Sequence, residues 1–123
     1  MTETREPTLR VTMLPRDTNA RGTIFGGVIL SHIDLAGAIA ASQQAPRNFV
    51  TRAMREVGFI APVYVGDLVS FYTSVVGEGK TSITIEVLVE AERSGESGKR
   101  IRVTEAEVIY VTIDAKRKPI SVR

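Results

Sequence analysis

An aspartate in the middle of an apolar segment is the residue whose chemistry most needs an explanation. Asp34 lies among Ile33, Leu35 and Ala36, and the charged residue that precedes it is Arg21. Burying an ionised carboxylate among apolar side chains is costly, and a carboxylate in such a setting can serve as a base or a nucleophile near neutral pH. The plainer alternative is that Asp34 faces solvent or pairs with an arginine, and the sequence leaves both interpretations open.

A loop rich in turn-forming residues leads into the same segment. It holds Asn19 and ends in the pair Gly26-Gly27. Free amide hydrogens at a helix N-terminus favour developing negative charge, and glycine lets a ligand approach the backbone closely. Together with an amide side chain they can polarise a carbonyl and stabilise an oxyanion. The same residues also suit a simple turn followed by a tight helix start.

One helix and about five strands must position these groups. The apolar segment predicts a helix from Gly26-Gly27 to about Gln44, ended by Pro46. Alternating apolar residues predict strands over residues 9–14, 50–60, 68–76, 81–91 and 100–114. In the last strand the apolar residues change parity, which predicts a bulge or bend near Glu105. The pattern indicates an α+β fold in which the helix lies on an antiparallel meander.

The predicted helix is apolar in nearly every direction, whereas a sheet can cover only one side of a helix. We therefore expect the sheet to curl around the helix and a second subunit to cover the remainder. The seven residues from Gly27 to Asp34 span about 10 Å of helix, too far for both to act on one carbonyl within a subunit. A two-fold dimer with antiparallel helices would bring Asp34 of one subunit against Gly27 and Asn19 of the other.

Length and composition limit the function classes. The chain has 123 residues and a net charge of +2 from 16 basic and 14 acidic side chains mixed along it, so we expect a single domain over residues 1–123 with no nucleic-acid-binding arm. It has no cysteine and one histidine, so a protein-only metal site would need carboxylates, and no such cluster stands out. The polar N-terminal residues lack a secretory signal, and His32 and Asp34 interrupt the longest apolar run. We expect a cytoplasmic protein with no membrane span.

The segment from Leu14 to Ala38 contains Asp-Thr-Asn, Phe-Gly-Gly and the mid-helix aspartate. It closely resembles the start of hotdog-fold acyl-CoA thioesterases of the YciA type, relatives of the cytosolic brain-type acyl-CoA hydrolases. Further matches at residues 59–67, 79–82 and 104–106 extend the resemblance over nearly the whole chain. It implies a long helix wrapped by an antiparallel sheet, and hydrolysis of acyl-CoA to a free acid and CoA without metal or organic cofactor. It also implies dimers with two interfacial sites, often assembled as a trimer of dimers.

The resemblance also assigns site residues by position. Asp34 is then the catalytic carboxylate, and Asn19 is its partner from the other subunit, with Gly27 at the helix end that polarises the carbonyl. Phe25 and Gly26 are expected to contact the substrate. The turn expected along the pantetheine and CoA comprises Gly79, Lys80, Thr81 and Ser82.

Other residues and functions stay open. Cations near the later hairpins can bind the CoA phosphates, and the candidates are Lys80, Arg93, Lys99 and Arg100. His32 stands where relatives often have glutamine and, two residues from Asp34, is expected to project from another helix face. The alternatives to a thioesterase are a noncatalytic acyl-CoA sensor and an enoyl-CoA hydratase on the same fold.

Overall fold

The computed structural model describes residues 5–93, 95, 96 and 98–123. The helix α1 spans Gly26–Ser42, and a short 3-10 helix, η1, spans Pro15–Asp17. The strands are β1 (Leu9–Thr12), β2 (Asn48–Phe59), β3 (Leu68–Glu78), β4 (Ser82–Glu92) and β5 (Arg100–Ile113). The helix and the strands end within two residues of their predicted limits. The polar N-terminal residues 1–4, and positions 94 and 97 of the loop before β5, lie outside the described residues.

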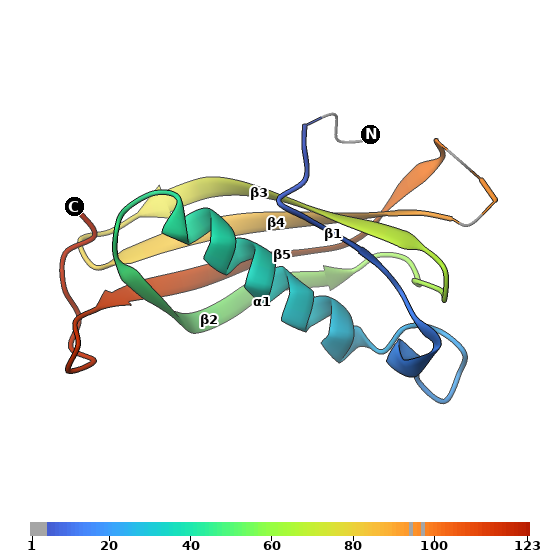
Figure 1. Ribbon diagram of the computed structural model, residues 1–123, viewed down its shortest axis with the longest axis horizontal. Coiled ribbons are helices and arrows are strands. Elements are labelled where there is room, and N and C mark those ends of the chain that lie inside the picture. Colours follow the sequence, from blue (N-terminus) through green and yellow to red (C-terminus); the bar gives the residue numbers. More distant parts are fainter. Residues whose placement is uncertain (1–4, 94, 97) are drawn as a thin grey trace.

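The strands form one antiparallel sheet in the order β1-β3-β4-β5-β2, and α1 lies across one face of it (Figure 1). The predicted meander is correct for β3, β4 and β5 but wrong for β2, which pairs with β5 at the far edge. The reason is that α1 carries the chain from β1 at one edge to β2 at the other, so residues 60–67 form a return connection instead of a hairpin turn. The predicted architecture of one long helix wrapped by an antiparallel sheet is confirmed.

The centre of the core is the face of β4 that packs against α1. Its alternate apolar residues are fully buried, as the sequence pattern predicted, and they are Ile83, Ile85, Val87 and Val89. Ile29, Ile33 and Ala36 of α1 belong to the same buried cluster. The middle of the helix is therefore fixed on the sheet by close packing.

Irregular strand pairing occurs in β5 and β2. The register of β5 against β4 slips at Val103, which confirms the predicted irregularity, two residues before Glu105. β2 slips twice against β5, once after Thr51 and once after Arg55. At the second slip Glu56 has a φ of 55°, a conformation that favours glycine. These slips determine which side chains of β2 face the helix.

α1 packs closely against β5 at Gly37. Both Gly37 and Tyr110 are buried. A Cβ on Gly37 would overlap the Tyr110 hydroxyl oxygen and lie 3.0 Å from the ring atoms Cε2 and Cζ. The distance between helix and sheet at this point therefore depends on the absence of a side chain at position 37.

Gly37→Ala is accordingly expected to destabilise the fold, although alanine favours the helix. Overpacking a core costs about 1–3 kcal/mol, whereas the gain in helix propensity is about 1 kcal/mol, so we expect a net loss of up to about 2 kcal/mol in the free energy of unfolding. Urea denaturation at one fixed protein concentration measures this loss. Ser42→Ala, at the exposed end of α1, is the control and should change the free energy by less than about 0.5 kcal/mol. Undiminished stability of Gly37→Ala would show that this contact does not set the helix position.

The side of α1 that faces away from the sheet is left uncovered in the single chain. Leu35 is 50% exposed, and Phe25 at the helix start is 57% exposed. Phe59, at the end of the edge strand β2, and Ile60 after it are 57% and 55% exposed. The curled sheet therefore leaves part of the helix surface uncovered in the single chain, and large apolar side chains remain exposed beside a sheet edge.

Candidate active site

Asp34 lies near the middle of α1 and is half-buried. The Thr51 hydroxyl of β2 donates to Asp34 Oδ1 at 2.7 Å. The Tyr110 hydroxyl of β5 donates to the Asp34 main-chain oxygen at 2.6 Å and lies 3.2 Å from Oδ1. The partners of the carboxylate are therefore two hydroxyls from adjacent strands. Both engage Oδ1, which makes Oδ2 the atom that can meet a reactant.

The surroundings of Tyr110 keep its hydroxyl protonated. The side chain is fully buried, and burial, followed by the neighbouring Asp34 carboxylate, raises the pKa of Tyr110 well above its ordinary value. The phenol is therefore neutral at physiological pH and acts as a hydrogen-bond donor toward Asp34.

Asn19 lies in the loop between η1 and α1, where its side chain closes the loop. Its Oδ1 accepts hydrogen bonds from the main-chain N–H groups of Arg21 at 2.8 Å and Thr23 at 3.2 Å. Its Nδ2 donates to Thr23 Oγ1 at 2.8 Å. Within the single chain, the Asn19 side chain therefore stabilises a turn. Because an amide nitrogen carries two hydrogens, the same fixed side chain can still donate to a carbonyl.

The start of α1 opens onto a mostly apolar pocket. A Cβ on Gly27 would lie 2.6 Å from the Phe25 ring, and a Cβ on Gly26 would lie 3.3 Å from the Phe59 ring, so both rings pack directly against the helix start. A pocket of about 280 Å³ lies here, bounded by Gly26, by Ile29 and by residues 59–63 among others. The first N–H groups of a helix have no partner within it. The Val28 N–H donates to the Phe25 oxygen at 2.9 Å, and the other N–H groups of the first turn can donate to an oxyanion.

The turn between β3 and β4 lies far from the Asn19 loop in the single chain. The turn is closed by a hydrogen bond from the Gly79 N–H to the Ser82 oxygen at 2.9 Å, and the Val122 N–H donates to the Lys80 oxygen at 2.8 Å. Figure 1 places this turn near the C-terminal end of α1, whereas Asn19 belongs to the loop at its N-terminal end. One chain therefore does not bring the predicted CoA-binding turn together with the predicted carbonyl-binding residues.

Two of the cations considered for the CoA phosphates are engaged within the chain. Arg93 Nε donates to the buried Asp67 carboxylate at 3.1 Å, and Arg100 donates to the Tyr72 hydroxyl at 2.7 Å. Lys80, by contrast, is exposed on the β3–β4 turn. Of these three, Lys80 is the best placed to meet a ligand that lies along the turn.

His32 faces the sheet rather than the candidate site. Its Nδ1 lies 2.8 Å from the main-chain oxygen of Val28, and its ring centroid lies 5.8 Å from that of Phe71. These contacts fit a structural role. His32 therefore does not form with Asp34 the His-Asp pair that an enoyl-CoA hydratase would need.

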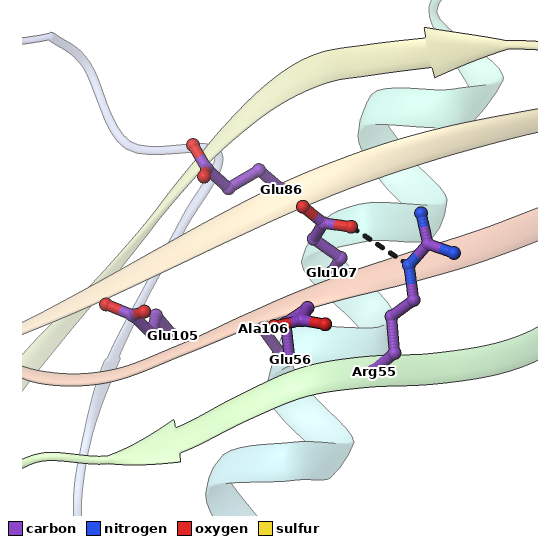
Figure 2. A pocket seen from close by; sticks show the side chains of 6 residues that line it. All are labelled: Arg55, Glu56, Glu86, Glu105, Ala106 and Glu107. Carbon is purple, nitrogen blue, oxygen red and sulfur yellow. Dashed lines mark hydrogen bonds and ion pairs between the residues drawn. The ribbon is translucent and has the colours of Figure 1, made fainter.

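An acidic pocket lies on the other face of the sheet, with α1 behind it (Figure 2). Its charged lining residues are Arg55, Glu56, Glu86, Glu105 and Glu107. Glu86 and Glu107 are direct cross-strand neighbours, an arrangement that is repulsive, and Arg55 Nε offsets it by binding Glu107 Oε1 at 3.0 Å. A surface dominated by carboxylates is unsuited to the anionic phosphates of CoA. The candidate active site is therefore on the helix side.

Within residues 5–93, 95, 96 and 98–123, no group of three or more histidine, aspartate or glutamate side chains is arranged to hold a metal ion. In the same part of the chain, no helix combines the length and the apolar character needed to cross a lipid bilayer.

The chain is similar to known thioesterases in sequence and in structure. The model of the thioesterase superfamily matches residues 21–97. The acyl-CoA thioester hydrolase YciA of Salmonella typhimurium is 44% identical over 116 residues, which cover 93% of this chain and 87% of that protein. A hexameric hotdog fold thioesterase of Campylobacter jejuni superposes with a TM-score of 0.90 at 46% identity, over 97% of this chain and 91% of the other. An acyl-CoA hydrolase from Staphylococcus aureus, in complex with butyryl coenzyme A, coenzyme A and coenzyme A disulfide, has a TM-score of 0.85 at 27% identity, over 93% and 69% of the two chains.

The fold and these likenesses define a hotdog-fold thioesterase. More narrowly, the chain belongs to the YciA family of acyl-CoA thioester hydrolases. The predicted family, fold and enzyme class are confirmed, and the sensor and hydratase alternatives lose their support.

Thr51 and Tyr110 are hydrogen-bond partners of Asp34 that the sequence did not reveal. Each lies in a strand of ordinary composition, and the contact of Thr51 with α1 depends on the register of β2, which slips just after it. Phe59 and Ile60 are different, because they belong to a motif that matches the family. Their place beside the pocket at the start of α1 could have been anticipated from that motif.

Proposed function

We propose that Asp34 is the catalytic carboxylate of this acyl-CoA thioester hydrolase, and that Asn19 and the Gly27 amide of a second copy polarise the thioester carbonyl. The observation that carries the proposal is the orientation of Asp34. Two hydroxyls hold Oδ1, and the residue lies on a helix whose outer side is left apolar and uncovered.

The reaction needs an oxygen delivered to the thioester carbon and donors for the charge that develops on the carbonyl oxygen. As a base, Asp34 takes a proton from water, whose oxygen adds to the carbonyl carbon. As a nucleophile, Asp34 adds directly and forms an anhydride that water then cleaves. In both routes the C–S bond breaks, CoA leaves as a thiolate that takes up a proton, and the acyl group leaves as a carboxylate. Asn19 Nδ2 and the N–H at the start of α1 donate to the oxyanion, and the scheme uses no metal or organic cofactor.

A second copy of the chain completes the proposed site, because Gly27 and Asp34 are about 10 Å apart along one helix. Two features of the single chain support such a dimer. β2 is an edge strand of 12 residues, and long unprotected edges tend to pair with another strand. Large exposed apolar side chains belong to the same elements: Phe59 ends β2, Leu35 lies on α1 and Phe25 precedes its first turn. Since the Campylobacter jejuni relative is hexameric, we propose three such dimers per assembly.

We assign the acyl group to the apolar pocket at the start of α1 and the CoA to the β3–β4 turn of the partner. In an antiparallel dimer, a turn near the C-terminal end of one helix comes close to the N-terminal end of the other, which supports this assignment. The proposed substrate-binding residues are Phe25, Gly26, Gly79, Lys80, Thr81 and Ser82. The Staphylococcus aureus relative was solved with butyryl coenzyme A, and acyl-CoA is the substrate class we propose here, acted on in the cytoplasm.

Asn19→Ala is expected to lower kcat/KM for acyl-CoA hydrolysis about 100-fold, since the loss of one oxyanion donor has an effect of that order. Thiol release from acetyl-, butyryl- and palmitoyl-CoA measures it. Asn19→Asp is the matched variant, because its carboxylate can still accept the two loop N–H bonds but has no amide donor. Both variants should be impaired, while the exposed Arg21→Ala should stay within about 2-fold of the parent. Unchanged turnover of both Asn19 variants would exclude Asn19 from the site.

A further inference from the structure

We infer that Tyr110 is a positioning residue for the reaction, whose hydroxyl fixes the Asp34 carboxylate so that Oδ2 faces the reacting atoms. The inference rests on the proposed catalytic role of Asp34. It concerns a different question, namely what holds that carboxylate in one orientation.

The Tyr110 hydroxyl bridges two acceptors of the same residue. It lies 2.6 Å from the Asp34 main-chain oxygen and 3.2 Å from Oδ1. Because one acceptor belongs to the helix backbone and the other to the side chain, the bridge restricts rotation of the carboxylate relative to the helix. The other donor, Thr51, contacts Oδ1 alone. The Tyr110 hydroxyl is therefore the donor that links the carboxylate to the helix backbone.

The hydroxyl itself is held in place by close packing. Tyr110 is fully buried on β5, a strand flanked on both sides by β4 and β2. Above it, Gly37 leaves so little space that a single added methyl group would overlap the hydroxyl. The raised pKa of Tyr110 keeps the proton on the oxygen. A rigid, protonated donor therefore sits beneath the residue that the proposed mechanism needs to orient.

Tyr72 provides a matched comparison within the same sheet. It is also fully buried, and its hydroxyl makes one hydrogen bond, accepted from Arg100 at 2.7 Å. Its neighbour Phe71 contacts His32 of α1, so Tyr72 points to the opposite face of the sheet. Removal of the Tyr72 hydroxyl costs the hydrogen bond from Arg100. Removal of the Tyr110 hydroxyl costs the contacts with the two oxygens of Asp34, so only this change reaches Asp34.

The test is a set of kinetic measurements on the assembled enzyme with butyryl-CoA. Tyr110→Phe is expected to lower kcat about 10-fold with KM changed less than about 2-fold, because the substrate still binds but meets a misoriented carboxylate. Tyr72→Phe should keep kcat within about 2-fold, while its melting temperature falls by about as much as that of Tyr110→Phe. In the Asp34→Ala background, Tyr110→Phe should not reduce the residual rate further, since the residue it orients is gone.

Three results would overturn the inference. They are a parental kcat for Tyr110→Phe, an equal loss in Tyr72→Phe, and an equal fold-loss with and without Asp34. If Tyr110→Phe does not assemble, 4-fluorophenylalanine at position 110 fills the space of the hydroxyl without a donor, and the same outcomes apply to it. Failure of the underlying function is distinguishable, because it appears as full activity of Asp34→Ala alone.

Discussion

Asp34→Ala is expected to lower kcat for acyl-CoA hydrolysis by about 1000-fold or more, because it removes the group that activates water or attacks the thioester. The fold should survive the change. The side chain is not part of the buried core, and Tyr110 keeps the main-chain oxygen of residue 34 as its partner. Thiol release measures the rate, and light scattering together with thermal unfolding checks that the assembly is intact.

Glu105→Ala is the control for the loss of a carboxylate elsewhere on the sheet. Glu105 is exposed and lines the acidic pocket on the face opposite α1, so its removal should leave kcat within about 2-fold. A folded Asp34→Ala assembly with parental turnover would refute the catalytic assignment. The assignment of the chain to the YciA family would stand, and another group would have to deliver the oxygen.

Mixed assemblies of Asn19→Ala and Asp34→Ala chains are expected to recover about one quarter of the parental activity, although each variant alone is nearly inactive. If every site takes Asp34 from one subunit and Asn19 from its partner, random pairing of equal amounts leaves about a quarter of the sites with both residues intact. Co-expression of the two chains at equal levels, followed by thiol-release measurements on the purified mixture, determines this fraction.

The same mixture gives a different result if the site lies within one chain. Every chain then carries one defective residue and no intact site can form. The activity of the mixture stays at the mean of the activities of the two single variants. Co-expression of Asp34→Ala with itself under two tags controls for purification effects. Recovery near one quarter therefore locates the site at the subunit interface, and background activity places it within a subunit.

The helix and strands could be predicted from the sequence because each depends on local periodicity. Residues 83–89 alternate strictly, and the helix starts at a glycine pair. The order of the strands could not be predicted in the same way. The place of β2 beside β5 depends on how far α1 carries the chain across the sheet, which is a long-range property.

Candidate site residues could be predicted where a residue is anomalous for its surroundings or belongs to a motif of the family. Asp34 stood out as a charge within an apolar helix, and its family resemblance pointed to the same residue. Thr51 and Tyr110 look ordinary in their strands, and their contacts with Asp34 follow from a register slip in β2 and from the small size of Gly37. Such features depend on packing between distant segments, which composition and spacing do not encode.

The uninterrupted helix between Gly27 and Asp34 has a consequence for how the enzyme can change. In the proposed dimer, each α1 contributes its first turn to one site and Asp34 to the other. The fixed spacing along one rigid helix therefore determines the geometry of both sites. A single-residue insertion between these positions would rotate Asp34 by about 100° and advance it by about 1.5 Å. The catalytic groups of both sites would be misaligned at once, so the length of this helical segment is constrained by both sites. A change in a surrounding loop would alter only the part of the site that the loop forms.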